Sequence, residues 1–135
     1  MKVYLLDIFS KDIKKENISN IELITTAKEV VEGLYDAKLG HNFYKKRIAL
    51  NNKGKRSSAR TIVTIVINNS VIFLHYFKKN EKSNIKKSHQ ADLKKISIAF
   101  QGLDENGINM LIEQSHLIEI KEWALWIDSL KTWMK

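Results

Sequence analysis

Two apolar stretches separated by three polar residues constrain the fold of this chain more than any other feature. The stretch "ARTIVTIVI" (59–67) is apolar at odd and even positions alike, "NNS" follows it directly, and "VIFLHYF" (71–77) is a second stretch of the same kind. A strand that is apolar on both faces needs cover on both faces, so each stretch is expected inside a sheet. The short connection predicts a tight hairpin near 59–78.

A third strand is predicted just before this hairpin. Two sets of side chains alternate along "FYKKRIAL" (43–50) and belong on opposite faces of a strand: Tyr44, Lys46, Ile48 and Leu50 on one, and Lys45, Arg47 and Ala49 on the other. The following "NNKGKRSS" (51–58) has the composition of a loop. We therefore expect three consecutive antiparallel strands.

Segments with helical periodicity lie before and after these strands in the sequence. Ser19 and Glu22 have capping-box spacing, and apolar residues then repeat at helical intervals, which predicts a helix over about 20–34 with Gly33 as terminator. A second helix is predicted up to Gly102, and a third in "DENGINMLIEQS". A first strand over 3–9, at an edge of the sheet and followed by a short helix, completes an α+β domain.

Composition limits the classes of protein that this chain can belong to. The chain has 135 residues, enough for one domain with a real core. It has no cysteine, which excludes disulfides and thiolate zinc sites, and with no export signal we expect a reducing cytoplasm. Its longest apolar run has only strand length, so we expect a soluble protein. The formal charge of +8 favours an anionic partner such as nucleic acid, an acidic protein or a membrane surface.

Much of the positive charge lies in "KKRIALNNKGKRSSAR" (45–60). Its seven cations are Lys45, Lys46, Arg47, Lys53, Lys55, Arg56 and Arg60. They are equally consistent with a surface that binds phosphates and with a hairpin whose charges serve solubility. Arg47 and Arg60 are stronger candidates for phosphate binding than the lysines, because a guanidinium holds a phosphate through two parallel hydrogen bonds. Strand pairing would also bring these two arginines together.

A second cluster follows the last strand of the hairpin, in "FKKNEKSNI" (77–85). It places Lys78, Lys79, Lys82 and Glu81 at the exit of an interior strand, where functional side chains are common, although a charged loop leading into a helix has the same composition. The four histidines lack metal-ligand spacing, so we expect no metal site. The sequence also lacks a nucleotide-binding glycine-rich loop and a nucleophile elbow.

In their order along the chain, these stretches resemble the RelE-like toxins of bacterial type II toxin–antitoxin systems, in the RelE/ParE superfamily. The matching segments are "EVVEGLYDAKLGHNFYKKRIA", "GKRSSAR", "FKKNEKSNI" and "LIEI", within residues 2–120. One departure is that Ser57 and Ser58 stand where the family usually has glycine, which stiffens the loop. The resemblance implies a toxin domain over 1–120. The tail from about 121 lies beyond the usual end of the family's pattern, and its helical periodicity predicts that 121–135 is an amphipathic, Trp-rich helical extension of the same domain.

The resemblance implies an α+β fold with N-terminal helices packed on one face of a small twisted antiparallel sheet, C-terminal helices, and a basic concave face opposite. It also implies an endoribonuclease that cuts mRNA on the ribosome without metal or other cofactor, and a cognate protein antitoxin, such as a helix-turn-helix protein, as partner. Two alternatives stay open: a ParE-type inhibitor of DNA gyrase, and a degenerate, non-catalytic homologue that only binds antitoxin and regulates.

Candidate site residues follow from the resemblance position by position. It implies catalytic roles for Arg47, Arg60, Lys79 and Glu81, where Glu81 orients Lys79 or accepts a proton. The residues implied to bind RNA or phosphate are Lys45, Lys46, Lys55, Arg56 and Lys78. His75 and Tyr76 are candidate acid/base groups by position, although the alternation of His75 with Phe73 and Phe77 is more typical of a core or rim histidine.

Overall fold

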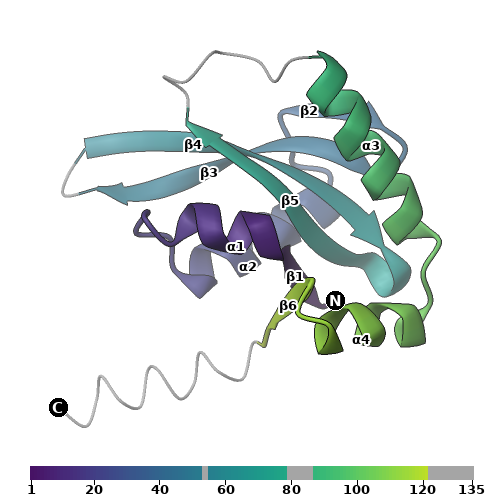
Figure 1. Ribbon diagram of the computed structural model, residues 1–135. Coiled ribbons are helices and arrows are strands. Elements are labelled where there is room, and N and C mark those ends of the chain that lie inside the picture. Colours follow the sequence, from purple (N-terminus) through teal and green to yellow (C-terminus); the bar gives the residue numbers. More distant parts are fainter. Residues whose placement is uncertain (53–54, 79–86, 122–135) are drawn as a thin grey trace, which may run out of the picture.

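The fold is built on one sheet of six strands in the order β2-β3-β4-β5-β1-β6 (Figure 1). This computed structural model describes residues 1–52, 55–78 and 87–121. The strands are β1 Val3–Leu6, β2 Ala37–Gly40, β3 Phe43–Asn52, β4 Lys55–Val66, β5 Ser70–Lys78 and β6 Leu117–Ile120. The helices of the described part are α1 Asp7–Ile13, α2 Asn20–Val31, α3 Lys87–Gln101 and α4 Glu105–Glu113.

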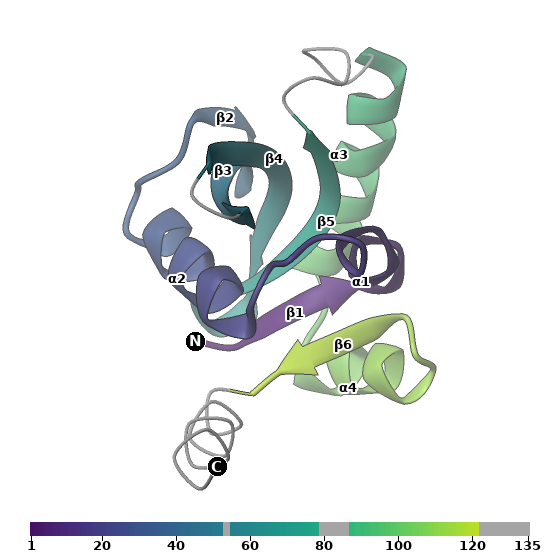
Figure 2. The same cartoon turned by 90° about the vertical axis from the view of Figure 1, so that its left-hand side faces the viewer.

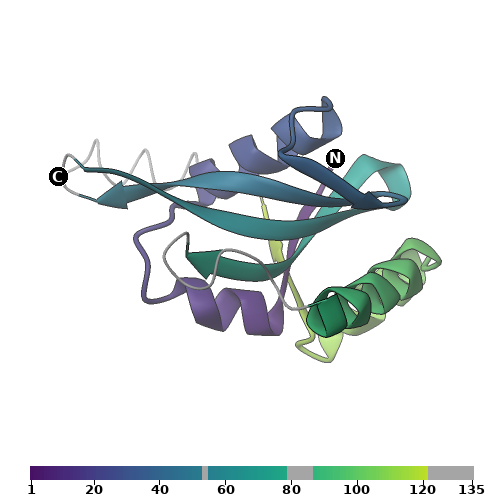
Figure 3. The same ribbon diagram turned by 90° about the horizontal axis from the view of Figure 1, so that it is seen from above.

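The three consecutive antiparallel strands predicted from the sequence are confirmed as β3, β4 and β5. β4 turns into β5 through a single 3₁₀ turn over Ile67–Asn69, where Asn68 and Asn69 have φ of 60° and 54°. Asparagine tolerates this left-handed conformation better than most residues, so "NNS" makes the turn without glycine. Figure 3 shows the β3–β4 ribbon projecting beyond α3 and α4.

The expectation of one strand over 3–9 is wrong, because the strand stops at Leu6 and α1 begins at Asp7. The Asp7 carboxylate accepts a hydrogen bond from the backbone N–H of Ile8, and the Asp7 N–H donates to the carbonyl oxygen of His116. Phe9 and Ile13, four residues apart, are then buried on one side of α1. Helical spacing in "DIFSKDI" thus decides the structure over strand-like composition.

The expectation of a purely antiparallel sheet also needs correction, because β1 pairs in parallel with β5 and antiparallel with β6. β1 was expected at an edge of the sheet but lies inside it, between β5 and β6, because both of its faces are apolar. Val3 and Leu5 belong to the core under α1 and α2, whereas Tyr4 belongs to the core under α3 and α4. A strand with two buried faces is stable only inside the sheet.

The resemblance implied helices on one face of the sheet and a basic concave face opposite, but helices cover both faces. α1 and α2 contribute Phe9, Leu23 and Val30 to one core, and α3 and α4 contribute Leu93 and Ile108 to the other. Figure 2 shows α2 and α3 on opposite sides of the strands. The apolar residues on both faces of β4 and β5 require this two-sided cover, as their composition predicted.

Helix ends follow the local chemistry that the sequence indicated. The Ser19 hydroxyl accepts a hydrogen bond from the backbone N–H of Glu22 at the start of α2, which confirms the predicted cap. α2 ends at Val31, and Gly33 follows with φ of 91°, a conformation that glycine adopts at little cost. In the described part of the chain, no helix has the length and apolar character needed to cross a lipid bilayer.

Candidate nucleic-acid interface

Arg47 and Arg60 are directly opposite each other on neighbouring strands. The register of β3 and β4 pairs Arg47 with Arg60, so the two side chains lie on the same face of the sheet. Lys45, two residues before Arg47, shares this face. We call these three residues the cationic face: Lys45, Arg47 and Arg60. The predicted approach of the two arginines through strand pairing is therefore confirmed.

The cationic face lies on the side of the sheet that α3 and α4 cover. Lys45 is opposite Ile62, and Arg60 is opposite Phe77 on β5. Ile62 and Phe77 belong to the core that contains Leu93 of α3. The cations therefore begin where the apolar cover of this face ends, which leaves a charged strip next to a packed helix.

Arg60 is held by two neighbours. Its Nε lies 3.4 Å from Oδ2 of Asp36, and its Nη1 donates a hydrogen bond of 3.4 Å to the Ser58 hydroxyl. The Arg60 side chain is only 16% exposed and that of Asp36 is 29% exposed. Like charges directly opposite on two strands repel, and the Asp36 carboxylate offsets that repulsion between Arg47 and Arg60.

Three aromatic rings form a row beside Arg60. The rings of His75 and Phe77 on β5 stack, with centroids 5.9 Å apart and planes at 25°, and the His89 ring of α3 lies 4.7 Å from that of His75. His75 is opposite Ile62, two positions along from the pairing of Arg60 with Phe77. The structure thus places the candidate acid/base group His75 on the same face as the two arginines.

The opposite face holds the other predicted residues whose side chains are described. Nζ of Lys46 lies 3.7 Å from Glu29 of α2, and Nζ of Lys78 lies 2.7 Å from Glu16, which follows α1. Tyr76 is buried in the core under α1 and α2, where its ring meets Phe9 edge-on at 6.4 Å. The sheet therefore separates Lys46, Tyr76 and Lys78 from Arg47 and Arg60.

Four predicted site residues lack a described side-chain geometry. Lys79 and Glu81 lie outside the described residues. Lys55 and Arg56 are in β4, where the register pairs them with Asn52 and Asn51. The roles assigned to these four residues stay predictions.

Three contributors to this face were not among the predicted site residues. Asp36 precedes β2, a short strand with no clear alternation, so nothing in the sequence indicated that it reaches Arg60. His89 comes from α3, and only tertiary packing brings it to His75. Ser58, which stands where the family usually has glycine, accepts a hydrogen bond from Arg60 in the structure.

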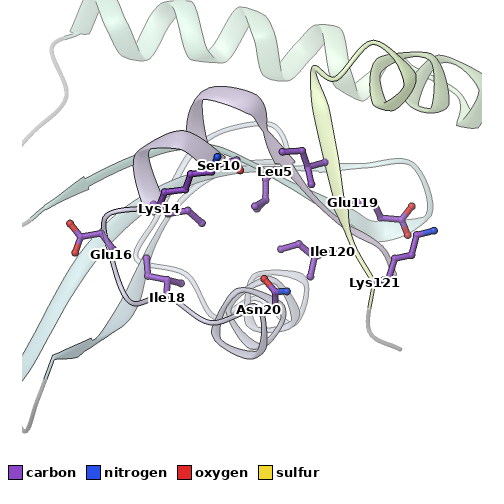
Figure 4. A pocket seen from close by; sticks show the side chains of 11 residues that line it. Leu5, Ser10, Lys14, Glu16, Ile18, Asn20, Glu119, Ile120 and Lys121 are labelled. Atoms are coloured by element: carbon purple, nitrogen blue, oxygen red, sulfur yellow. The ribbon is translucent and has the colours of Figure 1, made fainter. Parts of the chain in front are cut away.

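A separate pocket of about 580 Å³ opens at the edge of β6, bounded by α1 and the start of α2 (Figure 4). Its lining is apolar at Leu5, Ile13 and Ile120, and charged at Lys14 and Glu119, among others. Leu5, Ile13 and Ile120 belong to the core under α1 and α2. The pocket is therefore not part of the cationic face.

Together, these features define a small, basic α+β domain with paired arginines on one face of its sheet. Residues 1–120 match the family described as the RelE toxin of the RelE / RelB toxin-antitoxin system. The chain therefore belongs to the RelE toxin family, and this membership implies an antitoxin partner. The comparison with curated proteins gave no match.

Proposed function

We propose that this toxin is an endoribonuclease that cuts mRNA on the ribosome without a metal ion and so stops translation. The observation that carries the proposal is the pairing of Arg47 with Arg60, on the same sheet face as Lys45 and His75. Paired guanidinium groups are complementary to the oxygens of a phosphodiester in hydrogen-bond geometry, and their two positive charges match the double negative charge that develops at phosphorus during attack. Membership of the RelE toxin family is the second support.

The proposed reaction needs three things from the protein. The 2′-hydroxyl must lose a proton as its oxygen attacks phosphorus, the negative charge that builds up must be stabilised, and the departing 5′-oxygen must gain a proton. Arg47 and Arg60 supply the positive charge, together with Lys79 as implied by the family motif. The products are a 2′,3′-cyclic phosphate and a 5′-hydroxyl end.

Of the two candidate acid/base groups, we assign proton transfer to His75. An imidazole can both accept and donate a proton, and His75 lies on the face of the arginines. Tyr76 is buried on the other face against Phe9. We therefore expect His75→Gln to slow cleavage strongly and Tyr76→Phe to leave the rate of cleavage nearly unchanged, measured with equal amounts of folded protein.

We further propose that the antitoxin neutralises the toxin by covering the same cations. An acidic antitoxin segment competes with RNA phosphates for Arg47 and Arg60 by simple charge complementarity. If so, raising the salt concentration weakens both complexes, and Arg47→Ala weakens both as well.

Inducible expression in a bacterial host tests the function. Pulse-labelling of protein and DNA synthesis is expected to show early arrest of translation together with cut messages. A DNA-damage response without message cleavage would support a gyrase inhibitor instead, and normal growth would support a non-catalytic homologue.

Paired substitutions locate the site within the same assay. Arg60→Ala and Lys79→Ala are expected to abolish toxicity while the protein stays folded by circular dichroism. Lys95→Ala, at an exposed position of α3, is the matched loss of one positive charge and is expected to stay toxic. Full toxicity of both Arg60→Ala and Lys79→Ala would show that the site lies elsewhere.

A further inference from the structure

Asp36 forms an ion pair with Arg60, although Asp36 is not among the predicted site residues. Its backbone N–H donates a 2.9 Å hydrogen bond to the carbonyl oxygen of Lys45, which fixes the residue beside β3 just before β2 begins. From there its Oδ2 lies 3.4 Å from Nε of Arg60. Both partners are partly buried, so the contact forms in a region of reduced screening.

The guanidinium of Arg60 is contacted from two sides. Asp36 contacts Nε, and the Ser58 hydroxyl accepts from Nη1. Neither contact uses Nη2. An arginine that is already oriented loses less conformational entropy when it binds a phosphate, because its rotamer is set before the ligand arrives.

We propose that Asp36 is the positioning residue of this site: it orients the Arg60 guanidinium beside Arg47, so that both cations address one phosphate. This inference rests on the proposed ribonuclease function and deepens it. Asp36 touches no substrate and acts through Arg60. It also makes the close approach of Arg47 and Arg60 tolerable in the free protein by offsetting their mutual repulsion.

The inference predicts opposite effects on binding and on cleavage. The Asp36 carboxylate repels a phosphate, so its removal leaves the affinity for RNA unchanged or raises it. The same removal frees Arg60 to leave the geometry that stabilises the transition state, so cleavage slows. A residue that served only stability would change both measurements in the same direction.

The test compares Asp36→Asn with the full-length wild-type protein. Binding is measured by fluorescence anisotropy on a short RNA with a 2′-O-methyl group at each nucleotide, which resists cleavage. Cleavage is measured by primer extension on ribosome-bound mRNA with the toxin in excess. We expect binding of Asp36→Asn to be equal to or tighter than that of the wild type, and cleavage to be about 10-fold to 100-fold slower.

Two further variants distinguish an effect of the position of the Asp36 carboxylate from an effect of the protein's net charge. Glu29→Gln removes the carboxylate beside Lys46 on the opposite face, an equal change of net charge, and is expected to cleave at the wild-type rate. Asp36→Glu keeps a carboxylate and is expected to recover part of the lost rate. If Glu29→Gln cleaves as slowly as Asp36→Asn, the inference is overturned, because the change in net charge would then explain the slower cleavage.

Nuclear magnetic resonance gives a readout that does not depend on activity. The chain has three arginines, Arg47, Arg56 and Arg60, so the ¹⁵N-labelled protein has only three Nε–H signals to assign. In Asp36→Asn, the Nε–H of Arg60 is expected to shift and to exchange faster with solvent, whereas that of Arg56 stays unchanged. An unchanged Arg60 signal would show that Asp36 does not hold the guanidinium in solution.

Each outcome separates this inference from the proposed function. If the wild type cleaves and Asp36→Asn cleaves equally fast, the positioning role is wrong and the ribonuclease function stands. Slower cleavage that is matched by weaker binding also overturns the positioning role. If the wild type cuts no message on the ribosome, the proposed function fails and the inference falls with it.

Discussion

At the scale of single residues, the most informative finding is that two arginines face each other across β3 and β4. Alternation along "FYKKRIAL" predicted that Arg47 and Lys46 point to opposite faces, and they do. The sequence did not predict that acids partner several of the cations: Asp36 for Arg60, Glu29 for Lys46 and Glu16 for Lys78. These contacts depend on which helix or loop lies over which strand, and residue patterns do not specify that.

The free energy of unfolding depends on pH in part through the single residue Tyr4. Its burial raises the pKa of its hydroxyl, and the charges of Glu119 and Glu105 raise it further. The folded protein therefore keeps the Tyr4 proton at pH values where the unfolded chain, with a pKa near 10, has lost it. Because the native state then binds more protons than the unfolded state, the free energy of unfolding falls as the pH rises above about 10.

Tyr4→Phe is expected to remove part of this alkaline loss of stability. Urea denaturation at several pH values between about 9 and 11 measures the slope of stability against pH. Tyr35→Phe, at an exposed tyrosine, controls for the loss of a phenol. An identical slope for the wild type and Tyr4→Phe would contradict the assigned role of Tyr4.

At the scale of elements, sequence patterns predicted the long elements better than the short ones. β3, β4, β5 and α2 were expected because each combines a clear period with a turn or cap signal. β2 and β6 have four residues each, too few to show an alternation, so neither was predicted as a strand. α1 was mistaken for the end of a strand because "DIFSKDI" begins with residues that favour either structure.

The cap of α2 makes an element-scale prediction. Ser19→Ala removes the hydroxyl that accepts from the Glu22 N–H, so it is expected to lower the free energy of unfolding by about 0.5–2 kcal/mol. Ser19→Asp supplies another acceptor and is expected to retain most of the stability. Urea denaturation with an unchanged m-value measures both variants, and equal stability of Ser19→Ala and the wild type would show that the cap contributes nothing.

At the scale of the whole molecule, the family resemblance predicted the α+β fold class correctly, and the strand composition predicted where the helices pack. Apolar residues on both faces of β4 and β5 predicted cover on both sides, which α1 and α2 provide on one side and α3 and α4 on the other. The resemblance implied helices on one face only. The cationic face lies beside α3. Alternation along 43–50 predicted that Lys45 and Arg47 share a face, and strand pairing predicted that Arg60 approaches Arg47, but neither predicted the contact of Arg60 with Asp36.

The role of the Trp-rich extension, predicted over 121–135, can be tested by deletion. Residues 122–135 lie outside the described residues, and their sequence predicts an amphipathic helix that packs on its own domain or on a protein partner. Deletion of 122–135 is expected to lower the melting temperature or the affinity for the cognate antitoxin, measured by differential scanning fluorimetry and calorimetric titration. If neither quantity changes, the extension is dispensable for both.

We propose that Arg47 and Arg60, paired on one face of the sheet, are required for cleavage of mRNA on the ribosome. Primer extension on a defined message in a reconstituted translation system measures this directly, with wild type, Arg47→Ala, Arg60→Ala and Lys95→Ala compared at equal concentration. We expect discrete cuts within the message for wild type and Lys95→Ala, and few or none for the two arginine variants while they stay folded. An intact message with the wild type, or equal cutting by all four proteins, would contradict it.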